Sequence, residues 1–179
     1  KLPYTVWARE GDIHAPPGEN VSYRYVAQVL SEYSRDYAIQ LVAYDRFAFR
    51  RFEEDVSDLG LDLTFVEHPQ GGVKKGRLPD EIKEQAKREG REVEGLWMPG
   101  SLRLLEDALL EGRIRLKRNP VLISAMMSGV TESDRWDNYW LAKTRSINKI
   151  DAAVALCMAI GAAEMGGSDQ DSGFQVFFV

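Results

Sequence analysis

The segment of residues 38–44 constrains the fold of this chain more than any other. Its sequence, AIQLVAY, is almost unbroken apolar, and the charged residue Asp45 ends it. A short apolar run of this kind is typical of a β-strand that is covered on both faces. A helix with Phe49 and Val56 on its apolar face is predicted to follow, with Gly60 at its end, where glycine relieves left-handed strain. A strand followed directly by a helix indicates an α/β fold.

The rest of the chain continues this alternation of strands and helices. It predicts a mixed or parallel sheet flanked by helices. The last predicted helix is the most apolar of all and contains the single cysteine, Cys157. This last helix is predicted to begin at Ser146, and the other predicted helices begin after Asn20, at Ser101 and at Pro120. The other predicted strands cover residues 4–14, 61–68 and 113–117.

Length and charge narrow the functional classes. At 179 residues with 44% hydrophobic content, the chain can bury one sizeable core. Its 23 basic and 28 acidic residues give a net charge of -5, so a global basic field for nucleic acid is excluded, and any DNA contact must come from local patches or metal ions. No apolar run reaches the roughly 18 residues of a membrane span. We expect a soluble, cytoplasmic protein, and the absence of an initial Met indicates a fragment.

Two aspartates are the strongest candidates for chemistry. Asp45 follows an apolar strand, at the sheet edge where α/β proteins usually place their sites. A cap on the next helix is the competing interpretation. Asp151 is predicted one turn inside the last helix, on the same face as Val154 and Met158. A buried carboxylate needs a partner, and that partner is either a divalent metal or the helix macrodipole, with Lys149 nearby.

A pair of aspartates placed in this way suits Mg²⁺ or Mn²⁺. Hard divalent cations take oxygen ligands, and two ions about 4 Å apart can activate water and stabilise the leaving oxygen of a phosphodiester. Such a site usually needs a third or fourth carboxylate, which spacing alone does not identify.

Other candidate residues carry weaker signals. His14 and His68 lack metal-ligand spacing, and surface loops are the favoured interpretation for both. Basic residues cluster at 73–77 and at 113–118, where they are either solvated or line a track for phosphates. The charged, glycine-punctuated stretch of residues 72–95 predicts an exposed, mobile excursion near the site. The candidate DNA-binding residues are Lys74, Lys75, Arg77, Lys143 and Lys149.

The order of these features resembles the carboxyl-terminal nuclease domain of phage large terminase subunits. The matching segments are WAREGDI from Trp7 with the PPG that follows, LVAYDRF at 41–47, the stretch at 96–122 that ends in NPVL, and KTRSINKIDAAVAL at 143–156. Together they span most of residues 4–163. The combination of an aspartate in a YDR context with a late KIDA helix is fairly specific.

The resemblance implies a ribonuclease H-like fold and a metal-dependent endonuclease that uses two metals to cut concatemeric viral DNA. By the family pattern, Asp45 is the second metal-binding acid and Asp151 the last. The first acid is expected upstream of Lys1, on a strand that this chain lacks. The implied partners are double-stranded DNA, the terminase ATPase domain, the small terminase subunit and the portal, with Mg²⁺ or Mn²⁺ as cofactor in the host cytoplasm. The nuclease domain is predicted at residues 1–165 and a tail or linker at 166–179.

Two alternatives share the fold. One is a catalytically idle DNA-binding or docking domain, which the missing first acid favours. The other is a resolvase- or transposase-like nuclease, because those enzymes use the same arrangement of acids.

Overall fold

The computed structural model describes residues 2–47, 49–72 and 74–165. Helices and strands alternate along this part of the chain, and the predicted α/β class is confirmed. The elements are α1 (Tyr4–Glu10), α2 (Tyr23–Asp36), β1 (Val42–Tyr44), α3 (Phe49–Asp58), β2 (Phe65–Glu67), α4 (Asp80–Arg88), α5 (Met98–Leu110), α6 (Pro120–Ser128), β3 (Thr131–Ser133), β4 (Tyr139–Leu141) and α7 (Asp151–Met165).

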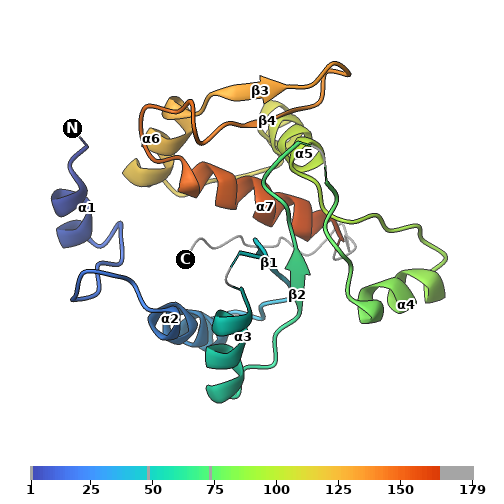
Figure 1. The fold of residues 1–179 in the computed structure, drawn as a ribbon, viewed down its shortest axis with the longest axis horizontal. Helices are drawn as coiled ribbons and strands as arrows, with labels where there is room; N and C mark the ends of the chain where they lie inside the picture. The colour runs from blue at the N-terminus through green and yellow to red at the C-terminus, as the bar shows by residue number, and fades with distance from the viewer. Residues whose placement is uncertain (1, 48, 73, 166–179) are drawn as a thin grey trace.

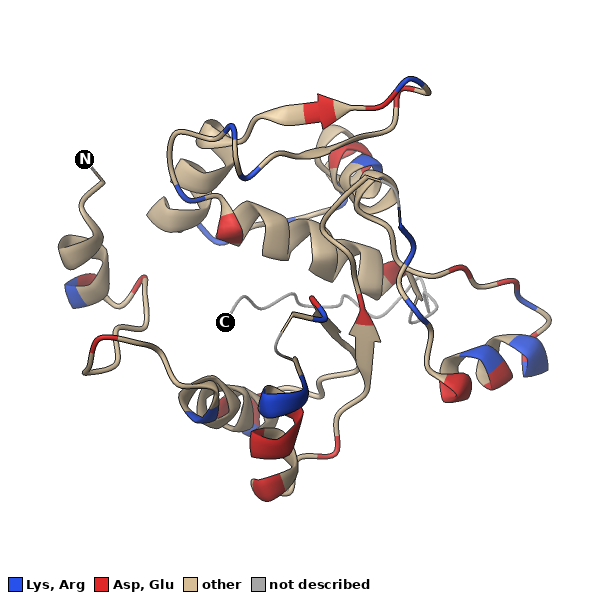
Figure 2. Ribbon diagram, viewed as in Figure 1, with Lys and Arg blue, Asp and Glu red and all other residues tan. Residues whose placement is uncertain are grey.

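Helix α7 lies at the centre of the molecule, between the β3–β4 hairpin and the β1–β2 pair (Figure 1). It packs against α5, α6 and β1. Charged residues lie near the two ends of α7, and the residues between them are apolar on all sides of the helix (Figure 2). A helix of this composition is stable only when neighbouring elements surround it. Its buried side chains, among them Leu156 and Cys157, form the main core together with residues of α5 and α6.

The strands are shorter than predicted and form two separate sheets. β1 and β2 are parallel, and Tyr44 pairs with Glu67 at their carboxyl ends. β3 and β4 form an antiparallel hairpin over α5. Parallel and antiparallel pairing therefore both occur among the described residues, but not within the single mixed sheet that was predicted.

The two faces of the β1–β2 sheet have different partners. Ala43 packs into the core that α7 shares with α5. The aromatic rings of Tyr44 and Phe65 point to the other face, where they contact Phe49 and, from Phe65, Phe52 of α3. Helix α2 then packs on α3, so the sheet lies between α7 and α3. Because side chains alternate between the two faces of a strand, neighbouring residues at the carboxyl edge of the sheet point to opposite faces.

Several local predictions are confirmed. Asn119 caps α6, where its side chain accepts hydrogen bonds from the backbone N–H groups of Val121 and Leu122 at 2.9 and 3.1 Å. Gly60 and Gly112 follow α3 and α5 with positive φ angles of 67° and 68°, as expected of glycine after a helix.

Two predicted strands are wrong. Residues 4–10 form α1, because Pro3 precedes a stretch that ends in the helix formers Ala8, Arg9 and Glu10, and the left-handed Gly11 then stops the helix. Residues 113–117 have no strand partner and follow α5 as an extended connection. In both segments the alternation of apolar and polar residues was real, but no neighbouring strand is present among the described residues to pair with.

The charged excursion at 72–95 contains the surface helix α4, in which acidic and basic residues are interspersed along the ribbon (Figure 2). Most of its side chains are exposed, in agreement with the prediction. The predicted tail at 166–179 lies outside the described residues. No helix in the described ranges is both long enough and apolar enough to cross a bilayer.

Candidate functional site

Asp45 lies directly after β1 and is half-buried. Its carboxylate accepts a hydrogen bond from the backbone N–H of Phe47 at 3.2 Å, so it stabilises the turn between β1 and α3. Because side chains alternate along a strand, Asp45 points to the same face as Ala43, which is the face that packs on α7. The structure therefore places Asp45 at the sheet edge, as predicted. It also supports part of the capping interpretation.

Asp151 is the first residue of α7, not a residue one turn inside it. Its side chain is 64% exposed, so the prediction of an inward-facing carboxylate is wrong. The helix begins later than the sequence suggested, because residues 146–150 form a non-helical approach in which Asn148 bonds Ser128 at 3.0 Å. At the helix N-terminus a carboxylate interacts favourably with the macrodipole and stays in contact with water.

Lys143 is the partner of Asp151. Its ammonium group lies 2.6 Å from the Asp151 carboxylate, and both side chains are largely exposed. Sequence reasoning expected Lys149 in this place, but Lys149 is exposed and forms no ion pair among those of the described residues. The structure thus brings together one predicted acid and one predicted DNA-binding residue.

The basic residues of the loop before α4 lie close to the carboxyl end of β2. Gly76 sits so near Glu67 that an added Cβ would lie 1.8 Å from the Glu67 carbonyl oxygen. Arg77, which follows it, acts electrostatically on Tyr44, the partner of Glu67 in the sheet. Lys75 forms an ion pair with Glu94. Arg77 is therefore the residue of the 74–77 cluster that the fold holds beside the sheet edge.

Glu67 is a further acidic residue at this sheet edge, which the sequence analysis did not single out. Glu67 is the last residue of β2, just as Asp45 directly follows β1. Sites of α/β proteins usually lie at the carboxyl ends of strands, and this rule, which selected Asp45, would also have selected Glu67. In the parallel register Glu67 shares a face with Tyr44, away from the face of Asp45. Burial raises the pKa of the Tyr44 hydroxyl, and the charges of Glu67 and Glu53 raise it further. This side of the edge is therefore acidic, and Arg77 partly offsets its charge.

His68 is wholly buried, so the prediction of a surface loop is wrong for this residue. It follows Glu67, and its backbone N–H donates to the Tyr44 carbonyl at 2.8 Å, which extends the β1–β2 pairing by one residue. Its ring bonds Ser101 of α5. Burial lowers the pKa of His68, while the charge of Asp45 acts in the opposite direction as a smaller effect. His14, by contrast, is exposed and lies 3.4 Å from the Tyr25 hydroxyl.

The described residues do not supply a complete metal centre. Within the described ranges no group of three or more His, Cys, Asp or Glu side chains lies close enough together to hold a metal ion. Asp45 is engaged with the Phe47 N–H and Asp151 with Lys143. A hard cation needs more oxygen ligands than two separately engaged carboxylates supply.

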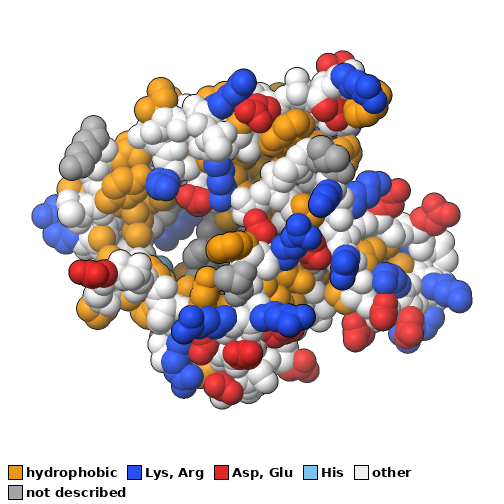
Figure 3. Space-filling view, in the orientation of Figure 1, with side chains coloured by type: hydrophobic (Ala, Val, Ile, Leu, Met, Phe, Trp, Pro, Cys, Tyr) orange, Lys and Arg blue, Asp and Glu red, His pale blue; other side chains and the backbone are white. Residues whose placement is uncertain are grey.

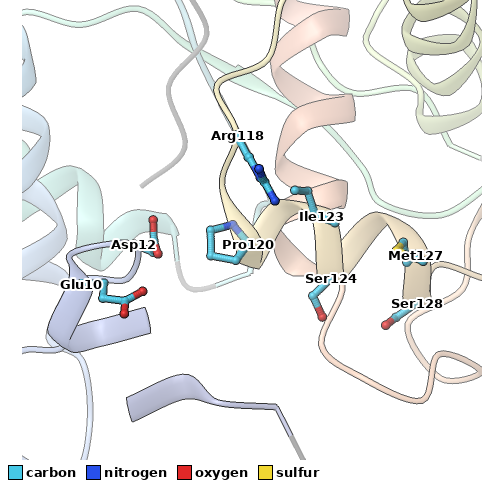
Figure 4. Close-up of a pocket in the computed structure, with 8 residues that line it drawn as sticks. All are labelled: Glu10, Asp12, Arg118, Pro120, Ile123, Ser124, Met127 and Ser128. Carbon is cyan, nitrogen blue, oxygen red and sulfur yellow. The ribbon is translucent and has the colours of Figure 1, made fainter. Parts of the chain in front are cut away.

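Charged side chains lie across the face of the molecule that Figure 3 shows. Figure 3 shows Lys and Arg side chains on both sides of the centre of the face, with Asp and Glu between them. An open cavity of about 660 Å³ lies between the turn after α1 and α6 (Figure 4). Arg118 is its one basic lining residue among those described, beside the acidic Glu10 and Asp12. None of the predicted site residues lines this cavity.

Comparison with known proteins gives three matches that agree. Residues 96–167 match the family model of the terminase large subunit, endonuclease domain. The large terminase subunit of Enterobacteria phage HK97 is 30% identical over 177 residues, which are 99% of this chain and 31% of that protein. The crystal structure of the HK97 bacteriophage large terminase superposes with a TM-score of 0.71 at 31% identity, covering 89% of this chain and 29% of that chain. This chain thus spans about a third of the relative's length, and the predicted resemblance is confirmed: the chain is related to the endonuclease domain of terminase large subunits.

Proposed function

We propose that this chain is the ribonuclease H-like, metal-dependent DNA endonuclease domain of a viral packaging terminase, which cuts concatemeric DNA. The observation that carries the proposal is the placement of the two aspartates. Asp45 follows β1 on the sheet face that packs on α7, and Asp151 is the first residue of α7. The similarity to the terminase endonuclease domain supports the same assignment.

Mg²⁺ or Mn²⁺ is the proposed cofactor, and two such ions would supply Lewis-acid activation of the scissile phosphodiester. Asp45 and Asp151 would each offer a carboxylate to it. The described residues lack a complete ligand set, so the proposal requires at least one further acid beside Asp45 and Asp151. Asp151 is exposed, and its ion pair with Lys143 is of the surface type that is easily exchanged for another partner.

Double-stranded DNA is the proposed substrate. The net charge of -5 gives no general attraction to it, so contacts must be local. Lys143 beside Asp151 and Arg77 beside the sheet edge are the best placed of the predicted DNA contacts. Lys74, Lys75 and Lys149 are exposed and stay candidates. The ATPase domain, small subunit and portal are the proposed protein partners, and the host cytoplasm is the proposed location.

One alternative is supported by a specific observation. Both aspartates have local partners, and no cluster of three acids is present among the described residues, as expected of an idle DNA-binding or docking domain. The resolvase- or transposase-like alternative receives no support from the terminase matches.

The test is plasmid cleavage with Mn²⁺, Mg²⁺ or EDTA, by this chain and by a longer protein, a full-length terminase large subunit that contains it. We expect weak or no cutting by the chain alone, and cutting by the longer protein that Asp45→Asn and Asp151→Asn each abolish. Asp80→Asn is a matched control, because Asp80 also opens a helix, is exposed and pairs with a lysine at 2.7 Å. Undiminished cutting by either site variant would remove that aspartate from the mechanism. DNA binding without cutting by the longer protein would favour the idle domain.

A further inference from the structure

A buried polar pair joins the sheet to α5. His68 and Ser101 are 0% and 3% exposed, and the Ser101 hydroxyl lies 2.8 Å from His68 Nε2. The other ring nitrogen, Nδ1, lies 3.0 Å from the Pro69 carbonyl oxygen. A carbonyl only accepts, so Nδ1 carries the proton and donates, and Nε2 accepts from the Ser101 hydroxyl. Every polar atom of this neutral ring is therefore satisfied.

Helix α7 makes room for this pair at Gly161. A Cβ added to Gly161 would lie 2.0 Å from Ser101 Oγ and 2.9 Å from Ser101 Cβ. It would also lie 3.4 Å from His68 Nε2. Any side chain at this position would displace the serine hydroxyl from the histidine. His68, Ser101 and Gly161, called the His68 clamp below, thus bring β2, α5 and α7 into contact at one point.

The clamp lies next to Asp45. His68 N–H bonds the Tyr44 carbonyl, and Asp45 and His68 are the next residues of the two paired strands. Their side chains share the face toward α7, and the Asp45 charge acts on the imidazole. A shift of β2 relative to α5 and α7 would move the strand end that positions Asp45.

The clamp is not a nucleophilic Ser–His pair. Both side chains are closed off from solvent, and Nδ1 is bonded to a backbone carbonyl instead of to an orienting carboxylate. Its contacts are all internal, and they join the three elements around the candidate site.

We propose that His68 is a positioning residue for this site, and that the His68 clamp fixes Asp45 in the geometry needed for DNA cleavage. The proposal rests on the proposed endonuclease function. Residues that orient a ligating group typically change activity about 10-fold to 100-fold when they are lost.

The test uses the longer terminase protein and variants that remove and then relocate the hydroxyl. Ser101→Ala leaves Nε2 without a donor. The double variant Ser101→Gly with Gly161→Ser supplies a hydroxyl from α7 instead, since a Cβ at position 161 would lie 2.0 Å from the place that the Ser101 hydroxyl oxygen now occupies. Leu122→Val, a mild core change on α6, controls for a general loss of stability.

We expect Ser101→Ala to lower kcat for plasmid cleavage about 10-fold to 100-fold with little change in KM, and the double variant to recover most of the loss. Hydrogen exchange of the Phe47 amide, which bonds Asp45, should accelerate in Ser101→Ala and slow again in the double variant. Leu122→Val should change neither readout.

Two results would overturn the proposal. One is Ser101→Ala with normal cleavage and normal Phe47 exchange. The other is a double variant that regains stability but not cleavage or Phe47 protection. If the wild-type longer protein does not cut DNA, the proposed function fails, whereas the Phe47 exchange series still decides whether the clamp holds Asp45.

Discussion

Replacing Asp151 with asparagine should affect activity far more than stability. The size of the loss of stability can be worked out from the structure. The carboxylate makes an ion pair with Lys143 and lies at the N-terminus of α7. With side chains 64% and 43% exposed, solvent screens the pair, which is worth roughly 0.2–1 kcal/mol. The interaction with the helix dipole adds roughly 0.3–1 kcal/mol. We expect Asp151→Asn to lower the free energy of unfolding by at most about 2 kcal/mol.

The measurement is urea unfolding followed by circular dichroism, at low and high salt. High salt should shrink the difference between wild type and Asp151→Asn, because both contributing interactions are screened. Lys143→Met should cost no more than Asp151→Asn, since it removes the ion pair but leaves the dipole interaction. In the longer protein the Asp151 variant should abolish cleavage, while the matched Asp80→Asn variant, with a similarly small loss of stability, should cut normally.

A loss of more than about 3 kcal/mol from Asp151→Asn would refute this reasoning. Such a loss is characteristic of a buried, paired charge, and it would mean that Asp151 is a structural residue of the α7 start. Its ion pair with Lys143 would then not be exchangeable for a metal or a phosphate.

Three further outcomes follow from the same structure. The free energy of unfolding should fall as pH drops below about 6.5, because burial lowers the pKa of His68 and the unfolded chain then binds a proton that the folded ring excludes. Urea unfolding at several pH values should show a weaker pH dependence in His68→Gln. The same pH dependence in this variant and in wild type would contradict the prediction. Leu156→Ala, at a fully buried position of α7, should lower the free energy of unfolding by roughly 2–5 kcal/mol in the same assay, and a loss below about 1 kcal/mol would show that α7 is not the core helix. Asn119→Ala removes both cap hydrogen bonds of α6 and should cost roughly 1 kcal/mol, whereas Asn119→Ser should retain most of the stability.

The sequence predicted those elements whose determinants are local. The Asn119-Pro120 cap, the helix at Phe49 and the glycines after α3 and α5 depend on backbone preferences that act over a few residues, and all of them are present. The apolar pattern of residues 4–14 and 113–117 predicts strands, but a strand also needs a partner. Pairing is a long-range property, and the described chain offers none at these positions.

In the candidate site, too, the sequence predicted only what depends on neighbouring residues. Asp45 could be placed because an apolar run ends at it, and that rule needs only neighbouring residues. Asp151 could be assigned to α7, but its exposure depends on where the helix begins. Asn148, in the non-helical segment before α7, bonds Ser128, which is 20 residues away and beyond the reach of a local pattern. The role of His68 was invisible because its partner Ser101 is 33 residues away, and no spacing rule connects them.

Asp45 and Asp151 differ in how firmly the fold holds them, and this difference also bears on the proposed activity. The carboxyl end of β1 is fixed from three sides: by the turn that Asp45 forms, by the His68 clamp and by the packing of α7 on the sheet. At the start of α7 the Asp151 side chain is exposed and is held by the surface ion pair with Lys143, whereas the preceding residue Ile150 is buried in the core. A site built from these two parts has one rigid carboxylate and one that is free to change partners. When a cation or a DNA phosphate binds, Asp151 and Lys143 would therefore exchange partners, while the Asp45 carboxylate keeps its position.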